Sequence, residues 1–276
     1  MIPPFYTPDP RWAGEIARIA EALALVGADE TNEEPAPQAL ELRKSHRVSA
    51  VHSSAAIEGN TLSREQVASL AEGKVVFAPP REVLEITGAL TAYEAMDSFD
   101  PFAVTDFLRA HGLLTAGLVR ESGQFRTVDV EIVNAAGEVL HTGSRHAKVP
   151  RLIAEALEWA ATSDDHPLVV SSGLHFLIEH IHPFRDGNGR IGRLWQTLLL
   201  SRWNPLFAWM PTETIIRSRQ RGYYQALQDS REPEIDAALF IEFMLEVIGE
   251  TVSGYVSSLS SAGDVGATAD RREVRP

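Results

Sequence analysis

The stretch His182-Pro-Phe-Arg-Asp-Gly-Asn-Gly-Arg-Ile-Gly-Arg193 separates two apolar segments of the chain. Before it, residues 168–181 place apolar side chains at helical spacing, and after it, residues 194–200 are apolar enough to form a core helix. This pattern predicts a helix, a tight polar loop and a second helix. The loop then lies at the N-terminus of the second helix.

The glycines and arginines of this stretch suit the binding of phosphate groups. A helix N-terminus presents unpaired N–H groups and the positive end of the helix dipole, so it favours an anion. Gly187 and Gly189 allow a sharp turn and let the backbone approach a phosphate without a Cβ in the way. Arg190 and Arg193 are three residues apart, so both guanidinium groups lie on one helix face, where they suit a polyphosphate.

The remaining polar residues of the stretch suit group transfer. Asp186 supplies the hard oxygen that Mg²⁺ accepts when it also binds substrate phosphates. His182 is the only side chain of the loop that can accept a proton near neutral pH. We expect Asn188 to help orient a phosphate and Phe184 to point into the core and anchor the loop. Together these residues predict a phosphoryl- or nucleotidyl-group transferase.

Three other nucleotide or metal motifs do not fit the stretch. Residues 187–192 match the dinucleotide-binding pattern GxGxxG, but that pattern needs a strand directly before it, and here the preceding pattern is helical. A calcium-binding EF-hand loop starting at Asp186 would need Gly at Ile191 and Glu at Thr197. The chain also contains no Walker A lysine motif.

The stretch resembles the signature of the Fic (filamentation induced by cAMP) family, HxFx(D/E)GNGRxxR. Every fixed position is matched, by His182, Phe184, Asp186, Gly187, Asn188, Gly189, Arg190 and Arg193. The resemblance implies a mainly α-helical bundle with one small β-hairpin flap. It also implies an enzyme that moves AMP from ATP–Mg²⁺ onto a Tyr, Thr or Ser hydroxyl of a target protein. Kinase-type relatives carry Lys at the second glycine, so Gly189 favours AMP transfer.

A second segment, Ser54-Ala-Ala-Ile-Glu58-Gly59, closes a helix predicted over residues 39–57. Taken alone, it is a helix C-terminus, where the helix dipole mildly disfavours a carboxylate. However, it also resembles the inhibitory motif (S/T)xxxE(G/N) of many Fic proteins. The resemblance implies that Glu58 pairs with Arg193, competes with the γ-phosphate of the nucleotide and so autoinhibits the enzyme.

Composition limits the classes of partner. The 276 residues are enough for a substantial core, and the formal charge of −13 argues against general binding to nucleic acids or anionic membranes. The chain has no cysteine, which excludes disulfides and cysteine-based zinc sites. We find no secretory signal pattern and no uncharged stretch of the length that a bilayer needs. We therefore expect a soluble, cytoplasmic protein.

The chain divides into three predicted regions. Residues 1–100 form an N-terminal helical region that carries the inhibitory helix, residues 101–258 form the catalytic core, and residues 259–276 form a disordered tail that is poor in large apolar side chains. Further helices are predicted over residues 12–26, 63–71, 82–96, 104–119, 150–161, 212–228 and 235–258.

The strongest strand pattern lies within residues 128–133. A turn at residues 134–137 and a second strand with Val139, Leu140 and His141 follow, so the pattern predicts a β-hairpin. The resemblance implies that this hairpin is a flap that aligns a target segment by strand addition. A structural hairpin that binds no target is the alternative.

Aromatic residues and histidines outside these segments give further predictions about single side chains. The segment Arg219–Tyr224 resembles the tyrosine pair that lies near the nucleotide base in the family, so Tyr224 is a candidate to stack on adenine. At least one tyrosine of the pair is expected in the core. His111 is predicted to be structural, and the spacing of His175, His180 and His182 does not suit a metal site.

Several functions remain open at this stage. ATP and a target protein are the expected partners, but the same residues also suit AMP removal, with Glu58 positioning a water, or a kinase-like or phosphocholine-transferring relative. A catalytically silent binding module belongs to a different class, and the intact His182 and Asp186 argue against it. Formation of a homodimer through exposed helix faces is a further open alternative.

Overall fold

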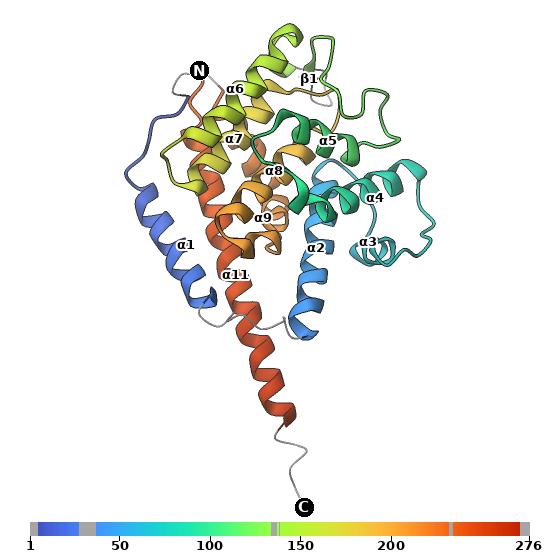
Figure 1. Cartoon of the computed structure of the whole chain (residues 1–276), viewed down its shortest axis with the longest axis vertical. Coiled ribbons are helices and arrows are strands. Elements are labelled where there is room, and N and C mark those ends of the chain that lie inside the picture. Colours follow the sequence, from blue (N-terminus) through green and yellow to red (C-terminus); the bar gives the residue numbers. More distant parts are fainter. Residues whose placement is uncertain (1–4, 28–36, 134–136, 138, 232–233, 271–276) are drawn as a thin grey trace, which may run out of the picture.

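The computed structural model of the chain describes residues 5–27, 37–133, 137, 139–231 and 234–270. This part is mainly α-helical and contains one two-stranded antiparallel hairpin, as expected (Figure 1). The elements are α1 (Trp12–Gly27), α2 (Pro37–Ile57), α3 (Arg64–Ala71), α4 (Pro80–Glu94), η1 (Met96–Ser98), α5 (Val104–Leu114), β1 (Glu131–Val133), β2 (Val139–Thr142), η2 (His146–Lys148), α6 (Val149–Thr162), α7 (Pro167–Ile181), α8 (Asn188–Trp203), η3 (Pro205–Ala208), α9 (Thr212–Ser218), α10 (Gln220–Asp229) and α11 (Ala238–Asp270).

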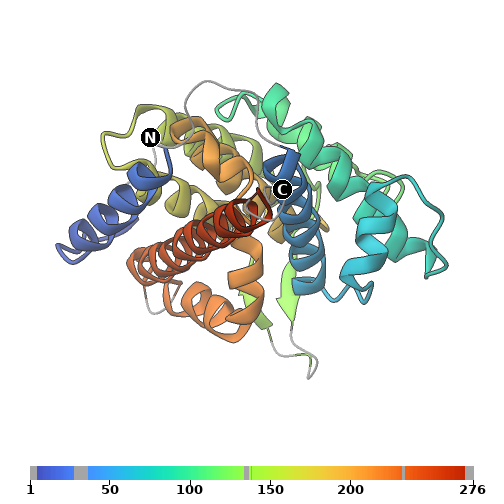
Figure 2. The same ribbon diagram turned by 90° about the horizontal axis from the view of Figure 1, so that it is seen from below.

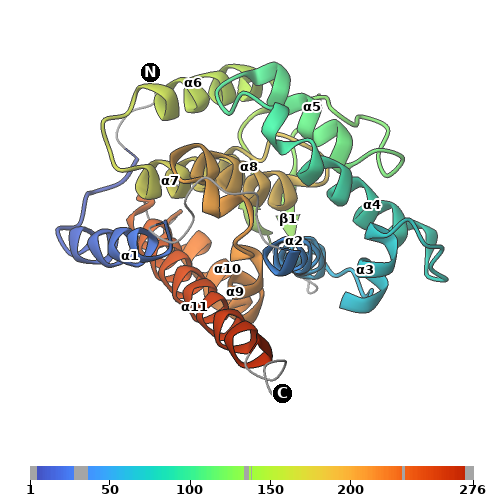
Figure 3. The ribbon, with the colours of Figure 1, turned by 60° about the horizontal axis from the view of Figure 1, so that its bottom comes forward.

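The helices α7 and α8 form the centre of the fold and pack against each other. Both are buried on nearly every face, and side chains such as Phe176 and Trp195 are fully buried, which is typical of core helices. Figure 3 shows α5 and α6 on one side of this pair and α9, α10 and α11 on the other. The loop between α7 and α8 therefore sits on a rigid base.

The N-terminal helices surround this core. Helix α1 packs along α11, whereas α2 contacts α3, α4, α8 and α9. In Figure 2, α11 runs between α1 and α2. Helix α3 begins at the predicted capping box, in which the Ser63 hydroxyl accepts from the Gln66 N–H and the Gln66 side chain accepts from the Ser63 N–H. The position of α2 brings the predicted inhibitory segment to the core.

The hairpin is shorter than the sequence pattern predicts. Glu131 pairs with Thr142 and Ile132 with His141, and an irregularity follows between Ile132 and Val133. The predicted turn at residues 134–137 lies outside the described residues apart from Gly137. The prediction of a hairpin in this part of the chain is confirmed.

Two predicted helices are shortened or divided in the structure. Helix α5 ends at Leu114, because Thr115 leaves the helical backbone conformation and Gly117 adopts a positive φ of 75°. The predicted helix over residues 212–228 is split at Arg219, whose φ is −109° and ψ is 25°. The Arg219 guanidinium contacts Glu246 of α11 at 2.6 Å, so a tertiary contact accompanies the break.

The last helix is longer than predicted. The backbone of α11 is helical to Asp270, and Figure 1 shows its end projecting below the rest of the molecule. The structure therefore differs from the predicted disordered tail over residues 259–270, while residues 271–276 lie outside the described part. Each residue added to an existing helix gains a hydrogen bond without a new nucleation cost, which accounts for the extension. None of the described helices is long and apolar enough to cross a membrane.

Candidate active site

The loop between α7 and α8 turns through two left-handed residues. His182, at the C-terminus of α7, has a φ of 53°, and its N–H donates to Ile178 O at 2.9 Å. Gly187 has a φ of 85° and precedes α8, where its carbonyl accepts from Ile191 N at 3.0 Å. Since a helix precedes the loop, the rejection of the dinucleotide-binding pattern is confirmed.

Asn188 and Phe184 fix the shape of the loop. The amide oxygen of Asn188 accepts from Phe184 N at 2.9 Å, and its amide nitrogen donates to Phe184 O at 2.9 Å. The phenyl ring of Phe184 is fully buried, which confirms its predicted role as an anchor. Because both ends of the Asn188 side chain bond the loop backbone, this side chain shapes the turn, and its predicted role in orienting a phosphate would be carried out through the backbone.

His111 supports the loop from α5. Its ring stacks on Phe184 with a centroid distance of 3.5 Å, its Nε2 lies 2.9 Å from Asp186 O, and its Nδ1 accepts from Gly123 N at 3.1 Å. Burial lowers the pKa of His111 to about 4, so the ring is neutral and its Nε2–H donates to Asp186. His111 is therefore structural, as predicted, but its contact with this loop had no signal in the sequence.

Asp186 is held by two arginines. Its Oδ1 accepts from Arg190 Nη2 and its Oδ2 from Arg81 Nη2, both at 2.9 Å. Arg190 lies four residues along from Asp186, but Arg81 lies in the first turn of α4, 105 positions away in the chain. The sequence analysis did not identify Arg81.

The two arginines of the loop keep free donors at the start of α8. Arg190 is almost completely buried, and its Nε and Nη1 have no hydrogen-bond partner among the described residues. Arg193 is also buried, and its Nη1 has no partner in the same part of the chain. Buried donors without acceptors are costly, so these three groups suit an anionic ligand.

Arg193 is paired with the C-terminal part of α2. Its Nε donates to Ser54 Oγ at 3.0 Å, and its Nη2 donates to Ser54 O at 3.0 Å and to Glu58 Oε1 at 2.7 Å. Burial disfavours the charged guanidinium, but the attraction of Glu58 outweighs it and raises the pKa of Arg193. The pairing that the Fic resemblance implies is therefore present, while its inhibitory effect stays a prediction.

The Glu58 carboxylate also covers the first turn of α8. A Cβ at Gly189 would collide with Glu58 Oε1 and would lie 3.3 Å from Glu179 Oε1. Glu179, from α7, is buried and accepts from Tyr223 Oη at 3.2 Å. Burial and then the charge of Glu58 raise the pKa of Glu179. The sequence analysis missed Glu179, because its apolar neighbours in α7 give no sign of a second carboxylate at this turn.

His182 has a partly buried, neutral imidazole. Burial and then the charge of Arg231 lower its pKa to about 4, and its Nδ1 has no partner among the described residues. Arg126, which the sequence analysis also missed, donates from Nε to His182 O at 2.7 Å and fixes this residue from the segment before the hairpin. A neutral imidazole retains a lone pair that can accept a proton.

The hairpin lies beside His182. His141 Nε2 is 2.7 Å from His180 O, and a Cβ on Gly143 would lie 3.2 Å from the Cβ of His182. Val139 and Leu140 are 52% and 44% exposed. The three predicted flap residues thus lie on β2 near the loop, two of them at the surface.

The tyrosine pair is divided between core and surface. Tyr223 is buried, as predicted for at least one of the pair, and its Oη lies 3.1 Å from His175 Nε2. Tyr224 is 47% exposed, and its hydroxyl donates to Ile57 O at the end of α2. His175 is buried in the core and also bonds Gln196. The described residues contain no group of three His, Asp or Glu that could hold a metal ion.

The fold and the loop define a class of helical proteins that carry a tight polar turn, followed by two buried arginines with unpaired donors, between two core helices. Residues 101–200 match the Fic/DOC family. Over almost its whole length the chain is similar to a Fic family protein from Desulfovibrio desulfuricans G20, with 40% identity, a TM-score of 0.84, and coverage of 93% of this chain and 77% of the other. The chain belongs to the Fic family.

More distant relatives share the fold or part of the sequence. Fic-1 from C. elegans has a TM-score of 0.68 at 22% identity and covers 91% of this chain and 74% of its own, so the likeness shows the fold. Proteins named protein adenylyltransferase Fic from Culex quinquefasciatus and Nematostella vectensis are 27% and 24% identical over 76% and 75% of this chain. The chain spans 42% and 48% of those proteins, less than half of each.

Proposed function

We propose that this protein is a protein adenylyltransferase, which moves AMP from ATP onto a Tyr, Thr or Ser hydroxyl of a target protein. The observation that carries the proposal is the set of unpaired donors at the start of α8, on Arg190 and Arg193. The Asp186 carboxylate bonds Arg190 Nη2 at 2.9 Å, and His182, whose imidazole is neutral, begins the same loop. The names of the similar proteins in Culex and Nematostella support the same activity.

The carboxylate of the loop fits a magnesium ion that binds together with the nucleotide. Asp186 is the single carboxylate of the loop, and Mg²⁺ is commonly held by one or two carboxylates together with substrate phosphates and water. When bound, the ion would neutralise part of the negative charge of the phosphates. Asp186 would hold it after Arg81 gives up its contact with Oδ2.

In the proposed reaction, the target hydroxyl oxygen attacks the α-phosphorus of ATP, and the bond to the pyrophosphate leaving group breaks. His182 takes the hydroxyl proton. The N–H groups of Gly187, Asn188 and Gly189 and the guanidinium groups of Arg190 and Arg193 hold the phosphates. Catalysis then rests on positioning and charge neutralisation, and the base contributes on the order of 10²–10⁴-fold.

The proposal assigns two neighbouring surfaces to the substrates. Tyr224, half exposed beside the end of α2, would contact the adenine base. Val139, Leu140 and His141 on β2 would pair with an extended target segment, which places its hydroxyl near His182. Strand addition relies mainly on main-chain hydrogen bonds, so it tolerates different target sequences.

Glu58 would act as an autoinhibitory residue. Its carboxylate bonds Arg193 and occupies the space above Gly189, where a phosphate would bind the start of α8. A carboxylate and a γ-phosphate compete for the same guanidinium group. The resting enzyme would therefore bind ATP weakly or in an orientation unsuited to transfer.

Labelled ATP tests this function. Glu58→Gly is expected to transfer label from [α-³²P]ATP onto itself or a target protein at least about tenfold faster than the wild type, whereas label from [γ-³²P]ATP is not transferred. His182→Ala in the same background should abolish transfer and keep ATP binding. Transfer of the γ-label would instead identify a kinase, and binding without any transfer would identify a non-catalytic module.

Removal of AMP is the second candidate. It is favoured by the position of Glu58, whose carboxylate is held in the site by Arg193 and remains 36% exposed, so it could orient a water. In that case the wild type would release AMP from a modified target faster than Glu58→Gly does. Measuring both directions with the same pair of proteins separates the two functions.

A further inference from the structure

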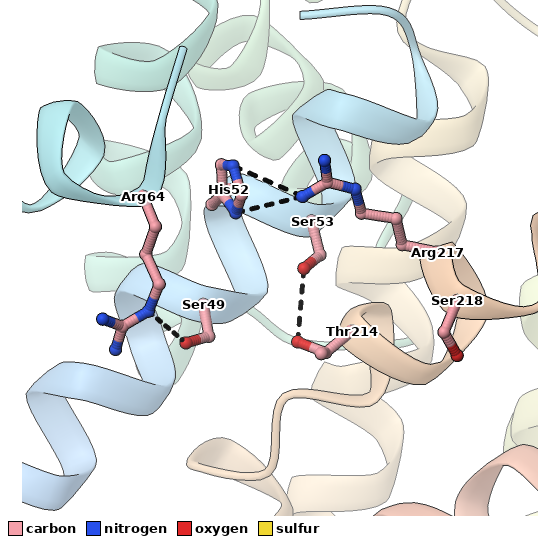
Figure 4. Close-up of a pocket in the computed structure, with 7 residues that line it drawn as sticks. All are labelled: Ser49, His52, Ser53, Arg64, Thr214, Arg217 and Ser218. Carbon is pink, nitrogen blue, oxygen red and sulfur yellow. Dashed lines mark hydrogen bonds between the residues drawn. The ribbon is translucent and has the colours of Figure 1, made fainter. Parts of the chain in front are cut away.

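A second polar cavity lies between α2, α3 and α9. Its volume is about 350 Å³, and Figure 4 shows the side chains that surround it. Its lining residues are Ser49, His52, Ser53, Arg64, Thr214, Arg217 and Ser218. We refer to it as the α2–α9 cavity, and it shares no residue with the site at the start of α8.

The cavity concentrates positive charge and hydroxyl groups. Arg64 Nε donates to Ser49 Oγ at 3.0 Å, and Arg217 Nη1 lies 3.2 Å and 3.3 Å from the two ring nitrogens of His52. In the part of the chain that the structure describes, no carboxylate lies within 4.0 Å of either guanidinium group. Both arginines therefore lack an acidic partner among the described residues, although the chain carries a net charge of −13.

His52 experiences this positive field directly. Burial and then the charge of Arg217 lower its pKa, and Arg64 acts in the same direction. Glu65 is the acidic residue that partly offsets this effect. An anion placed in the cavity would offset the positive charge that surrounds His52 and would receive hydrogen bonds from the guanidinium groups.

We propose that the α2–α9 cavity binds the phosphate group of a small phosphorylated molecule. Guanidinium groups match the geometry of phosphate oxygens, and one hydroxyl of the hydrogen-bonded pair Ser53 and Thr214 keeps a proton that it can donate as well. The volume lies near the lower end of the range for small-molecule sites, roughly 300–1,000 Å³, so it leaves room for a short organic group beside the phosphate. Free phosphate and a phosphomonoester share this chemistry.

The cavity adjoins the inhibitory segment. Ser53 lines the cavity and its neighbour Ser54 bonds Arg193, so one turn of α2 contacts both sites. The walls come from three helices in the arrangement that also places Glu58 on Arg193. A ligand that binds this arrangement better stabilises it. Resting on the proposed function, the inference predicts that phosphate binding strengthens inhibition.

Calorimetric titration in the absence of nucleotide tests the binding site. Inorganic phosphate and glycerol 3-phosphate are each titrated against sodium chloride at matched ionic strength. We expect saturable binding that Arg64→Gln/Arg217→Gln weakens at least about tenfold and that Arg18→Gln/Arg151→Gln leaves unchanged. The control pair removes the same charge from exposed positions on α1 and α6. Tighter binding of glycerol 3-phosphate identifies a phosphomonoester, and equal binding identifies free phosphate.

Two further measurements locate the ligand and separate the two proposals. The His52 ring resonances, assigned with His52→Gln, should shift on phosphate addition. Binding that survives in Arg64→Gln/Arg217→Gln but is lost in Arg190→Gln would assign the anion to the start of α8 and overturn the inference, as would the absence of saturable binding.

The effect on activity is measured with the same ligands. Phosphate should slow AMP transfer by the wild type, but not by Arg64→Gln/Arg217→Gln or by Glu58→Gly, although it still binds the Glu58→Gly protein. Binding without any effect on wild-type transfer would overturn the regulatory part alone. Absence of transfer by Glu58→Gly would overturn the proposed function and leave the binding result standing.

Discussion

Arg81 Nη2 donates to Asp186 Oδ2 at 2.9 Å and so joins the first turn of α4 to the loop between α7 and α8. Arg81 is also paired with Glu85 one turn along α4. The N-terminal region therefore occupies both charged ends of the proposed nucleotide site, with Glu58 on Arg193 and Arg81 on Asp186. A metal ion and the guanidinium group of Arg81 would compete for the same carboxylate oxygen.

Replacing Arg81 with Gln should lower the Mg²⁺ concentration needed for activity. In the Glu58→Gly background, we expect the Mg²⁺ midpoint of AMP transfer to fall by roughly threefold to tenfold, because one competing positive charge is removed from Asp186. The side chain of Arg81 is 61% exposed, so stability should change by less than about 1 kcal/mol. Arg151→Gln, an exposed arginine of α6, is the control, and an unchanged midpoint in Arg81→Gln would contradict the prediction.

A methyl group at Gly189 should disrupt the site in two ways. In Gly189→Ala the new Cβ would collide with Glu58 Oε1 and lie 2.9 Å from Arg193 Nη1, so the ion pair must shift. The same Cβ would fill the space proposed for a phosphate, so AMP transfer should fall at least about a hundredfold even in Glu58→Gly.

Gly254→Ala in α11 is the matched control for that substitution. A Cβ at Gly254 would meet no heavy atom within 4 Å, and alanine is favoured over glycine in a helix by about 1 kcal/mol. We therefore expect unchanged activity and equal or higher thermal stability. ATP binding by Glu58→Gly/Gly189→Ala that equals that of Glu58→Gly would show that the phosphate does not approach this glycine.

The pH dependence of transfer should reflect the lowered pKa of His182. A base acts in its neutral form, and with a pKa of about 4 His182 is neutral throughout the range from pH 5 upward. Between pH 7 and pH 5.5, we expect no fall in the kcat/KM of the Glu58→Gly enzyme from protonation of His182. Circular dichroism checks that the protein stays folded over this range. A decline with a midpoint near 6.5 would show an imidazole with an ordinary pKa.

Local sequence signals predict the centre of the fold and much of the site. The helix–loop–helix around residues 182–193, the capping box at Ser63 and the hairpin follow from patterns within a few residues, and the structure contains all three. The pairing of Glu58 with Arg193 came from resemblance to the family, since the residues near Glu58 indicate only the end of a helix.

The remaining parts depend on contacts between distant segments. His111, Arg81 and Arg126 reach the loop from positions 75, 105 and 56 residues away from their partners, and no periodic pattern marks such contacts. Similarly, the break at Arg219 accompanies a contact with Glu246 on α11. The sequence alone therefore predicts which residues form the loop but not which side chains hold it in place.

Buried histidines should make the protein sensitive to acid. His175 has a pKa of about 3 because it is completely buried, whereas an unfolded chain has an ordinary histidine pKa near 6.5. Between these values the unfolded state binds a proton that the folded state does not bind, so the free energy of unfolding falls as the pH falls below about 6.5. Protonation of His175 in the unfolded state alone should lower the free energy of unfolding by about 3 kcal/mol at pH 4.5.

Urea unfolding between pH 7 and pH 4.5 measures the free energy of unfolding, and its slope against pH is compared between variants. His175→Gln cannot take up the proton, so the free energy of unfolding should depend on pH less steeply than in the wild type, by about 1.4 kcal/mol per pH unit. Some slope should remain, because burial also lowers the pKa values of His111, His141, His180 and His182 to about 4. An identical slope in His175→Gln would mean that the imidazole of His175 does not lose its proton affinity on folding.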